Sequence, residues 1–170
     1  MPEPELLDVV DTFDRVIGQT TKARAHTSGE IHRVVVVYLF NGAGELYMQS
    51  VGRLKLWDHS VGGHVKKNED YDSAVAREAK EELALNKPLL FVGKIYSDEA
   101  KRHSNYRHMY AIYTARVGRG WKFEPNNEVR QLDALPIEKV TELMKVKPEA
   151  FTAGFLATMK YYQTKGSKPR

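Results

Sequence analysis

The chain has 170 residues, of which 42% are hydrophobic and 28% are charged, and its formal net charge is +4. These values are typical of one soluble globular domain, and they exclude intrinsic disorder and a collagen-like repeat. Because cysteine is absent, disulfides, thiolate metal ligands and a cysteine nucleophile are excluded as well. The acidic N-terminus is unlike a secretory signal, and no apolar run approaches the roughly 18 residues of a membrane span. A cytoplasmic location without a membrane partner is therefore expected.

The strands are predicted from runs of alternating or β-branched residues that are separated by turn signals. They cover residues 6–11, 15–21, 32–40, 45–50, 57–65, 89–97 and 108–117, with a further strand near 129–132. Residues 22–30, KARAHTSGE, are interpreted as a polar connection that ends in a turn at Ser28–Gly29.

Three helices are expected. The first covers residues 70–85, with Asn68 or Asp70 as its N-cap. The other two begin at Pro136 and Pro148, because proline is favoured in the first turn of a helix. Strands, one helix, further strands and two terminal helices together predict an α+β fold, a layered α/β/α sandwich with a mixed β-sheet.

No linker divides the chain, so residues 1–170 are expected to form one domain. Its expected parts are a core at 30–165, a strand pair and connection at 1–29, and a flexible tail at 164–170. The positive charge is scattered rather than clustered, so a nucleic-acid partner is not expected. Only residues 94–108 interleave cations with tyrosines, and they are interpreted as a solvated loop or, alternatively, as a basic pocket for a small anion.

The first helix carries carboxylates on its apolar face. At about 100° per residue, Glu78 and Glu82 fall near the centre of the apolar stripe and Glu81 falls at its margin. Partly buried like charges lose hydration and repel each other, so they need a cation nearby. A divalent metal would supply it, and an all-oxygen ligand set favours Mg2+ or Mn2+. In the alternative, these carboxylates lie beyond the core and pair with Arg77 or Lys80.

Residues 63–85, GHVKKNEDYDSAVAREAKEELAL, resemble the Nudix box, G-x5-E-x7-R-E-U-x-E-E-x-G-U, where U is a bulky apolar residue. The matching polar and glycine positions are Gly63, Glu69, Arg77, Glu78, Glu81 and Glu82. The final apolar position, Leu85, also matches, whereas Ala79 is small for its position and Ala84 replaces a glycine. The chain thus resembles the MutT-like Nudix hydrolase superfamily.

This resemblance implies a Mg2+- or Mn2+-dependent hydrolase. Water would attack phosphorus and split the diphosphate linkage of a nucleoside diphosphate that is linked to another moiety. The resemblance also implies that Glu78 and Glu82 bind the metal together with the Gly63 carbonyl, and that Glu81 is a ligand or the general base. The partner is then a small-molecule diphosphate, and a homodimer is compatible with the family.

Two further roles follow from the resemblance. Arg77 would pair with Glu69 and orient it rather than touch the substrate. An acidic residue from a late loop would be a ligand or base, with Glu128 as the candidate and Glu124 as the fallback. The alternative for Glu128 is an exposed loop carboxylate without a role.

The chain also resembles the branch of the superfamily that contains isopentenyl-diphosphate isomerases. There, a cysteine near the position of Val61 or Gly62 is essential, and histidines at positions like His26, His32 and His64 hold a metal with downstream glutamates. This chain has no cysteine and reads NYRHMY where the glutamates would lie, so a hydrolase is favoured. Satisfied or exposed histidines are favoured over a second metal site, which stays open.

Three side chains are candidates for binding the substrate. Arg53 and Lys55 would be charge partners for phosphate, and His64 directly follows Gly63. The segment QSVGRLKLWD that carries the two cations is shorter than usual in this branch, which leaves the shape of the pocket open. A different class of function, a Nudix-fold module that binds a nucleotide without cleaving it, is disfavoured because every carboxylate of the box is kept.

Ala84 leaves two ways to end the helix. It either takes the left-handed conformation, at a cost of about 1 kcal/mol, or the helix continues to Asn86. We expect the continuation, because asparagine tolerates the left-handed conformation and Pro88 enforces the end.

Overall fold

The computed structural model describes residues 2–102 and 105–166. Its strands are β1 (Leu6–Val10), β2 (Val16–Thr21), β3 (His32–Phe40), β4 (Glu45–Val51), β5 (Leu56–Asp58), β6 (Val61–His64), β7 (Leu90–Asp98), β8 (Arg107–Arg116) and β9 (Leu132–Pro136). Its helices are α1 (Lys22–Ser28), α2 (Tyr71–Leu83), α3 (Ile137–Val146) and α4 (Ala153–Gly166), with a 3-10 turn, η1, at Pro148–Ala150. The expected α+β fold with a mixed sheet is confirmed.

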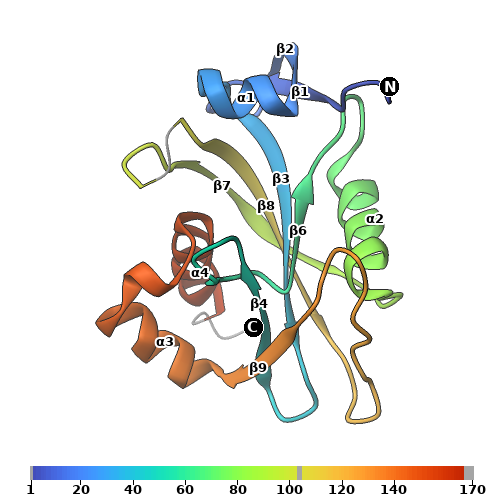
Figure 1. Ribbon diagram of the computed structural model, residues 1–170, viewed down its shortest axis with the longest axis vertical. Coiled ribbons are helices and arrows are strands. Elements are labelled where there is room, and N and C mark those ends of the chain that lie inside the picture. Colours follow the sequence, from blue (N-terminus) through green and yellow to red (C-terminus); the bar gives the residue numbers. More distant parts are fainter. Residues whose placement is uncertain (1, 103–104, 167–170) are drawn as a thin grey trace.

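β3 is the central strand of the sheet (Figure 1). It pairs in parallel with β8 and antiparallel with β6, and β7 continues the sheet beyond β8. β1 and β4 pair with opposite ends of β3, β2 lies beyond β1, and β5 and β9 both pair with β4. A central strand that is covered on both faces needs an almost continuous apolar sequence, which explains the run VVVVYLF.

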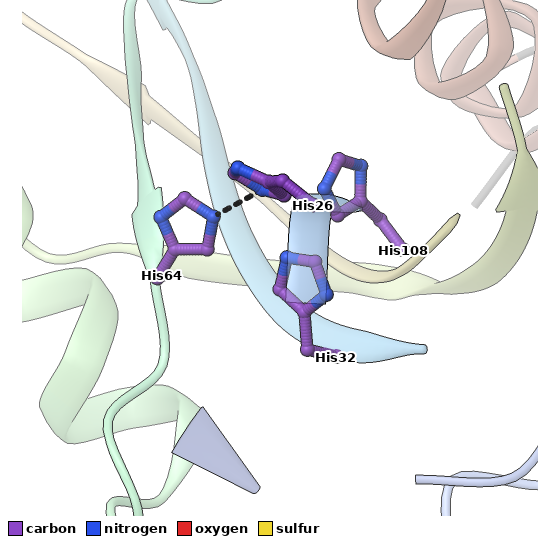
Figure 2. A group of neighbouring side chains, drawn as sticks. All are labelled: His26, His32, His64 and His108. Atoms are coloured by element: carbon purple, nitrogen blue, oxygen red, sulfur yellow. Dashed lines mark hydrogen bonds between the residues drawn. The ribbon is translucent and has the colours of Figure 1, made fainter. Parts of the chain in front are cut away.

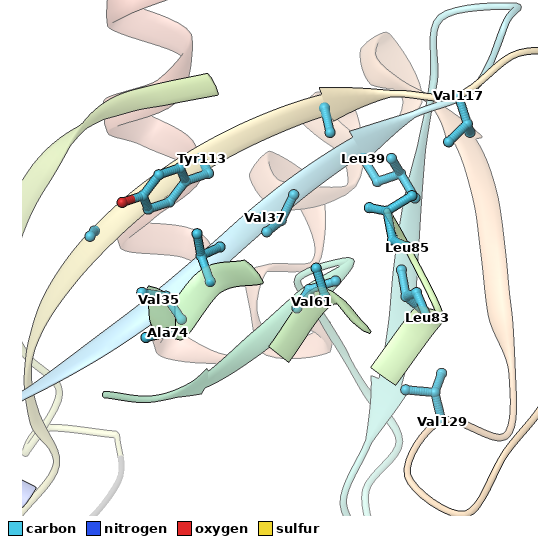
Figure 3. Close-up of a cluster of buried hydrophobic side chains, with 14 of the residues drawn as sticks. Val35, Val37, Leu39, Val61, Ala74, Leu83, Leu85, Tyr113, Val117 and Val129 are labelled. Atoms are coloured by element: carbon cyan, nitrogen blue, oxygen red, sulfur yellow. The ribbon is translucent and has the colours of Figure 1, made fainter. Parts of the chain in front are cut away.

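The helices cover both faces of the sheet, α2 on one side and α3 and α4 on the other (Figure 1). Alternate β3 residues point to opposite faces, so Val35 and Val37 join the core beneath α2 (Figure 3). Val36 and Tyr38 join the core beneath α4. α4 contributes apolar side chains to this second core, where Phe155 is fully buried.

The polar connection expected at residues 22–30 is instead the helix α1. The Thr21 side chain accepts a hydrogen bond from the Arg24 backbone N–H, which caps its start. Gly29 ends the helix in the left-handed conformation with φ 72°, at the turn that was predicted there. Only Ala25 of this helix is buried, so the sequence carries no helical pattern of apolar residues that would reveal it.

Other boundaries differ from the prediction. The strand expected at 57–65 is divided into β5 and β6. The late strand lies at Leu132–Pro136 rather than at 129–132, since the Asn126 side chain accepts from the Val129 N–H and holds that residue in a loop. Pro148 begins only the short turn η1, and α4 starts after Thr152. Of the expected tail 164–170, the first three residues belong to α4 and residues 167–170 lie outside the described part.

The expected continuation of the first helix to Asn86 is wrong. Ala84 takes the left-handed conformation with φ 49° and ψ 30°. Its N–H bonds to the Lys80 carbonyl, which is the αL pattern of helix ends, and the Leu85 N–H bonds to the Ala79 carbonyl, each at 3.0 Å. The buried Leu85 side chain holds this turn against the core, and its packing outweighs the local strain at Ala84.

Replacing Ala84 with glycine is expected to raise the free energy of unfolding by about 0.5–1 kcal/mol. Relief of the left-handed strain exceeds the entropy that glycine adds to the unfolded chain. The matched control is Ala76→Gly, at an exposed position inside α2, which should lower the same quantity by about 1 kcal/mol. Urea denaturation of both variants measures this, and a loss of stability in Ala84→Gly would contradict the account of the helix end.

Candidate active site

A cavity of about 720 Å³ collects side chains from α1, β4, β6, α2, β8 and the loop before β9. Its lining includes the carboxylates of the box helix, one carboxylate from the late loop and three histidines. These residues are Glu78, Glu81, Glu82, Glu128, His26, His64 and His108. The fold therefore brings the candidate carboxylates of the box helix and of the late loop to one cavity, together with polar residues that the sequence did not single out.

α2 presents its carboxylates at the edge of the core. The helix begins at the N-cap Asp70, whose side chain accepts from the Ser73 N–H at 2.8 Å. Ala79, which is small for its position in the box, is buried against the sheet and fits a close approach of the helix to β6. Glu78 and Glu82 consequently lie half-buried between the apolar face and the cavity, as the helical wheel predicts.

Arg77 connects the loop before α2 to the carboxylates on the helix. Its Nε and Nη2 donate to the two oxygens of Glu69, each at 2.9 Å, and Nη2 also donates to the His64 carbonyl at 3.0 Å. Its Nη1 donates to Glu78 Oε1 at 2.6 Å and to Glu81 Oε2 at 3.3 Å. The expected pair with Glu69 is present, and these hydrogen bonds raise the pKa of Arg77, so it stays charged.

The lack of a side chain at Gly63 leaves room for the Glu78 carboxylate. A Cβ atom at Gly63 would lie 2.0 Å from Glu78 Cδ, far inside van der Waals contact. A side chain at position 63 would therefore have to displace the Glu78 carboxylate from the space that it occupies. At Gly62 a Cβ would meet its nearest neighbour, a Val36 methyl, at an ordinary 3.8 Å.

Replacing Gly63 with alanine is expected to displace the Glu78 carboxylate and weaken divalent-metal binding at least about 10-fold, the smallest loss typical when the surroundings of a metal ligand are changed. Gly62→Ala is the matched control, because its added methyl meets only ordinary contacts. Isothermal titration with Mn2+ measures both variants. Equal affinities for wild type and Gly63→Ala would show that the Glu78 position does not matter for the metal.

Glu82 is the most strongly perturbed carboxylate of the site. Its Oε2 accepts from Gln49 Nε2 at 2.8 Å and from the Gly62 N–H at 3.3 Å. Burial, with further contributions from Glu78 and Glu128, raises the pKa of Glu82 to about 8. Burial also raises the pKa of Glu78, against the opposing effect of its Arg77 partner. Without a cation the cluster therefore favours protons, and this indicates a site built for added positive charge.

The late loop reaches the cavity through Asn126. Its Nδ2 donates to the Glu82 carbonyl at the end of α2 at 2.7 Å, and its Oδ1 accepts from the Glu128 N–H at 2.8 Å. Glu128 and the fallback residue Glu124 are both exposed, but only Glu128 lines the cavity. Gln49 and Asn126 position the site although no motif marked them, since their contacts join segments that are distant in sequence.

The four histidines converge from different elements (Figure 2): His26 from α1, His32 from β3, His64 from β6 and His108 from β8. One ring nitrogen from each lies within 4.8 Å of the others. Burial lowers the pKa of His32 to about 4 and that of His64 to about 2, so these rings are neutral at pH 7. The sequence suggested three of them but not His108, which the parallel register places opposite His32.

Two sequence-based candidates lie elsewhere. Arg53 and Lys55 are exposed in the turn between β4 and β5 and do not line the cavity, because the short turn ends before it can fold over the site. The lysine and arginine side chains that line the cavity, among the residues that the structure describes, are Lys22, Lys66 and Arg77.

The segment interpreted as a solvated loop is largely the β7–β8 hairpin. Residues 94–98 belong to β7 and residues 107–108 to β8, whereas residues 103–104 lie outside the described part of the chain. Tyr106 and His108 line the cavity. The hairpin thus contributes polar and aromatic side chains to the site rather than a cluster of cations.

The carboxylates fit a hard divalent cation. Within residues 2–102 and 105–166, hydrogen bonds involve Oε1 of Glu78 and Oε2 of Glu82, which leaves the second oxygen of each for a cation. The box groups proposed as ligands, which are its carboxylates and the Gly63 carbonyl, all offer oxygen atoms. Mg2+ and Mn2+ prefer oxygen ligands. These half-buried carboxylates lie next to Gly63, which is part of β6.

Residues 30–155 match the family model described as NUDIX domain. The chain belongs to the NUDIX family. It is similar to an isopentenyl-diphosphate Delta-isomerase of Pectobacterium atrosepticum, with 29% identity over 167 residues that cover 93% of this chain and 90% of the relative. It is also similar to an uncharacterized Nudix hydrolase of Streptomyces coelicolor, with 36% identity over 121 residues that cover 66% and 65%.

Solved structures agree with this Nudix assignment. The crystal structure of DR0079 from Deinococcus radiodurans superimposes with a TM-score of 0.66 and 26% identity, covering 84% of this chain and 90% of that one. The Nudix domain of Shewanella oneidensis NrtR, solved with ADP ribose, shares the fold with a TM-score of 0.59 at 15% identity. This Nudix protein is thus an enzyme of a family that acts on small-molecule diphosphates and generally uses a divalent metal. Among the described helices, none is long and apolar enough to cross a membrane.

Proposed function

We propose that this protein hydrolyses the diphosphate linkage of a nucleoside diphosphate that is linked to another moiety, with Mg2+ or Mn2+ as cofactor. The observation that carries the proposal is the pair of half-buried carboxylates, Glu78 and Glu82, whose pKa values are raised by burial in a cavity that also contains Glu128. Such a cluster is costly for the metal-free fold, and a divalent cation would offset that cost.

The metal would be held by Glu78, Glu82 and the Gly63 carbonyl, with Glu81 as a further ligand. When bound, it supplies positive charge to the diphosphate and lowers the pKa of bound water. Arg77 orients Glu69 and Glu78 through the hydrogen bonds described above. Glu81, which is 44% exposed, and Glu128 in the late loop are the candidates for taking the proton from the attacking water.

Lys22 and Lys66 are proposed to bind the phosphates. His64, the third candidate from the sequence, instead contacts His26 through its Nε2 atom. Both lysines line the cavity that contains the carboxylates, whereas Arg53 and Lys55 do not. A cavity of about 720 Å³ lies within the usual size range of ligand pockets and is large enough for a nucleotide. The cytoplasmic location and a homodimer remain predictions from the sequence and the family.

A second candidate is an isomerase-like activity, and the similarity to the Pectobacterium isomerase over 93% of the chain favours it. The absence of cysteine opposes it, because the isomerases that this chain resembles need one near Val61 or Gly62. Among the cavity residues, Glu82 is a titratable group in contact with those positions, since it accepts a hydrogen bond from the Gly62 N–H. The hydrolase is preferred because all carboxylates of the box are present and converge.

A substrate panel tests the proposal. Nucleotide sugars, dinucleoside polyphosphates, ADP-ribose, NADH and isoprenoid diphosphates are incubated with the protein and Mg2+ or Mn2+, and the products are identified by mass spectrometry. Release of phosphate or a nucleoside monophosphate from a panel member supports the hydrolase. Rearrangement of an isoprenoid diphosphate without cleavage would replace it with an isomerase. Tight metal-independent binding without turnover would replace it with a sensing module.

A further inference from the structure

We propose that His26, His32, His64 and His108 hold a structural transition-metal ion of the Zn2+ class, which fastens α1 to the sheet. This ion is distinct from the one at the carboxylates of α2, and the proposal does not depend on the reaction that those carboxylates perform. It rests on the convergence of four imidazoles, on two buried nitrogens without partners and on the weak attachment of α1.

The four ligand atoms are close enough for one ion. All lie within 4.8 Å of one another, and His26 Nε2 and His64 Nε2 are 3.2 Å apart. A tetrahedral ion with metal–nitrogen bonds of about 2.1 Å holds its ligand nitrogens roughly 3.4 Å apart. Small rotations of the outer rings would bring the set to that spacing, and Figure 2 shows the rings gathered around a common space.

Two of the rings point buried lone pairs at that space. His32 Nδ1 lies 2.9 Å from the Glu30 carbonyl, which can only accept, so Nδ1 carries the proton and Nε2 has the lone pair. His32 Nε2 and His108 Nε2 are buried and have no hydrogen-bond partner among the described residues. His32 is 0% exposed and His108 is 6% exposed. A buried polar atom without a partner costs about 1–3 kcal/mol, and a bound cation would remove that cost at both atoms.

His108 is oriented in the manner of a metal ligand. Its Nδ1 lies 3.1 Å from Glu99 Oε1, and the Tyr110 hydroxyl donates to the same oxygen at 2.7 Å. Glu99 is itself buried, so its carboxylate places a fixed negative charge behind the ring. A carboxylate that accepts from one imidazole nitrogen fixes the other as the ligand and increases its basicity.

The ligand set selects the kind of ion. Four neutral imidazoles suit Zn2+, Co2+, Ni2+ or Cu2+, whereas Mg2+ prefers oxygen ligands. The set differs from that of the isomerases, in which downstream glutamates complete the site, because here His108 makes it all nitrogen. Four protein ligands fill a tetrahedral shell and leave no open position, which is typical of structural rather than catalytic sites.

The ion would stabilise α1 in particular. This helix has seven residues and buries only Ala25. At its C-terminal end, Asn105 Nδ2 donates to the Thr27 carbonyl and Arg107 Nη1 donates to the Gly29 carbonyl. A helix this short is marginal without tertiary contacts. A metal bond from His26 to an ion shared with β3, β6 and β8 would fix it to the sheet, and with it the cavity wall that carries Lys22.

The test uses the full chain in the Glu78→Gln/Glu82→Gln background, which removes two of the three carboxylates that are proposed to hold a metal on α2. Chelator-treated protein is titrated with Zn2+ against a chromophoric competitor, and with Co2+ to record the visible spectrum of a tetrahedral ion. We expect one ion per chain and a tetrahedral Co2+ spectrum. We also expect slower amide hydrogen exchange in residues 22–28 when Zn2+ is bound, measured by mass spectrometry.

His108→Gln and His64→Gln are then added separately to that background, and each is expected to weaken Zn2+ binding at least about 10-fold. Two variants are used because His108 is buried and its substitution is the one more prone to unfold the chain, whereas His64 is only partly buried. The matched control is His59→Gln. His59 is also buried, but it bonds to Asp58 and Thr158 outside the cluster, so Zn2+ affinity should be unchanged.

The proposal is overturned if the background protein binds no Zn2+, if folded His64→Gln binds it as tightly as the background, or if Zn2+ leaves exchange in residues 22–28 unchanged. None of these readouts involves turnover. Failure of the histidine site is therefore distinguishable from failure of the proposed hydrolase.

Discussion

Replacing Glu82 with glutamine is expected to reduce turnover by more than about 100-fold while the fold survives. Loss of a group that only orients a metal ligand costs about 10–100-fold, so loss of a ligand should cost more. Glutamine keeps the shape of the side chain and can still accept from Gln49 and the Gly62 N–H, which leaves the packing intact. Steady-state kinetics on a substrate from the panel measures the loss, and circular dichroism checks the fold.

Glu138→Gln is the control for this prediction. Glu138 is exposed at the start of α3 and does not line the cavity, so its loss should change turnover by less than a factor of about 2. If Glu82→Gln cleaves a good substrate as fast as wild type, the role given to Glu82 is wrong, whatever the fold of the domain.

The second large effect concerns the stability of the metal-free protein. The pKa of Glu82 is about 8 in the folded state against 4.5 as the ordinary value, so above pH 4.5 the folded state binds more protons. The contribution of protonated Glu82 to the free energy of unfolding is therefore fully present below pH 4.5 and is lost as the pH rises to about 8. Between pH 6.5 and 8.5 the loss is about 2 kcal/mol, of which Glu82→Gln should abolish most.

Metal should reverse this loss, because coordination favours the ionised carboxylates. We expect Mg2+ or Mn2+ to raise the melting temperature of wild type at pH 8.5 and to leave the Glu78→Gln/Glu82→Gln variant unchanged. Denaturant titrations of chelator-treated protein at both pH values measure the first effect, and thermal melts with added metal measure the second. An equal rise in the double variant would mean that the stabilising ion binds elsewhere.

The parts of the site that lie on one helix were predictable from the sequence. The positions of Glu78 and Glu82 at the edge of the core follow from helical periodicity, and the spacing of the box located Gly63 and Arg77. The reason for the glycine was not predictable, because the contact between Gly63 and Glu78 depends on how α2 lies against β6.

Contacts between segments that are far apart in the chain could not be predicted from the sequence. His108 lies opposite His32 only because β3 and β8 pair in parallel, and that register leaves no local pattern. Asn126 reaches the end of α2 from a loop more than 40 residues away. Arg53 and Lys55 show the converse, since their charge suggested phosphate binding but a short turn keeps them away from the cavity.

At Ala84, the local conformational preference of alanine and the tertiary packing of Leu85 oppose each other, and the packing decides where the helix ends. The cost of a left-handed alanine, about 1 kcal/mol, favoured a longer helix. Burial of Leu85 against the first core requires the chain to turn at Ala84, and burying a leucine side chain stabilises by about 1.5–3 kcal/mol. Because the burial of Leu85 stabilises the fold by more than the strain at Ala84 costs, the helix ends at Ala84.

The central claim is that carboxylates of α2 direct water to phosphorus. The most direct test is a single reaction in H2(18)O with Mg2+ and a panel substrate, with the products analysed by mass spectrometry. We predict one 18O atom in the phosphate group of one product and none in the phosphate group of the other, because both products keep one phosphate. Label in a carbon-bound hydroxyl, or conversion of substrate without cleavage, would contradict the claim.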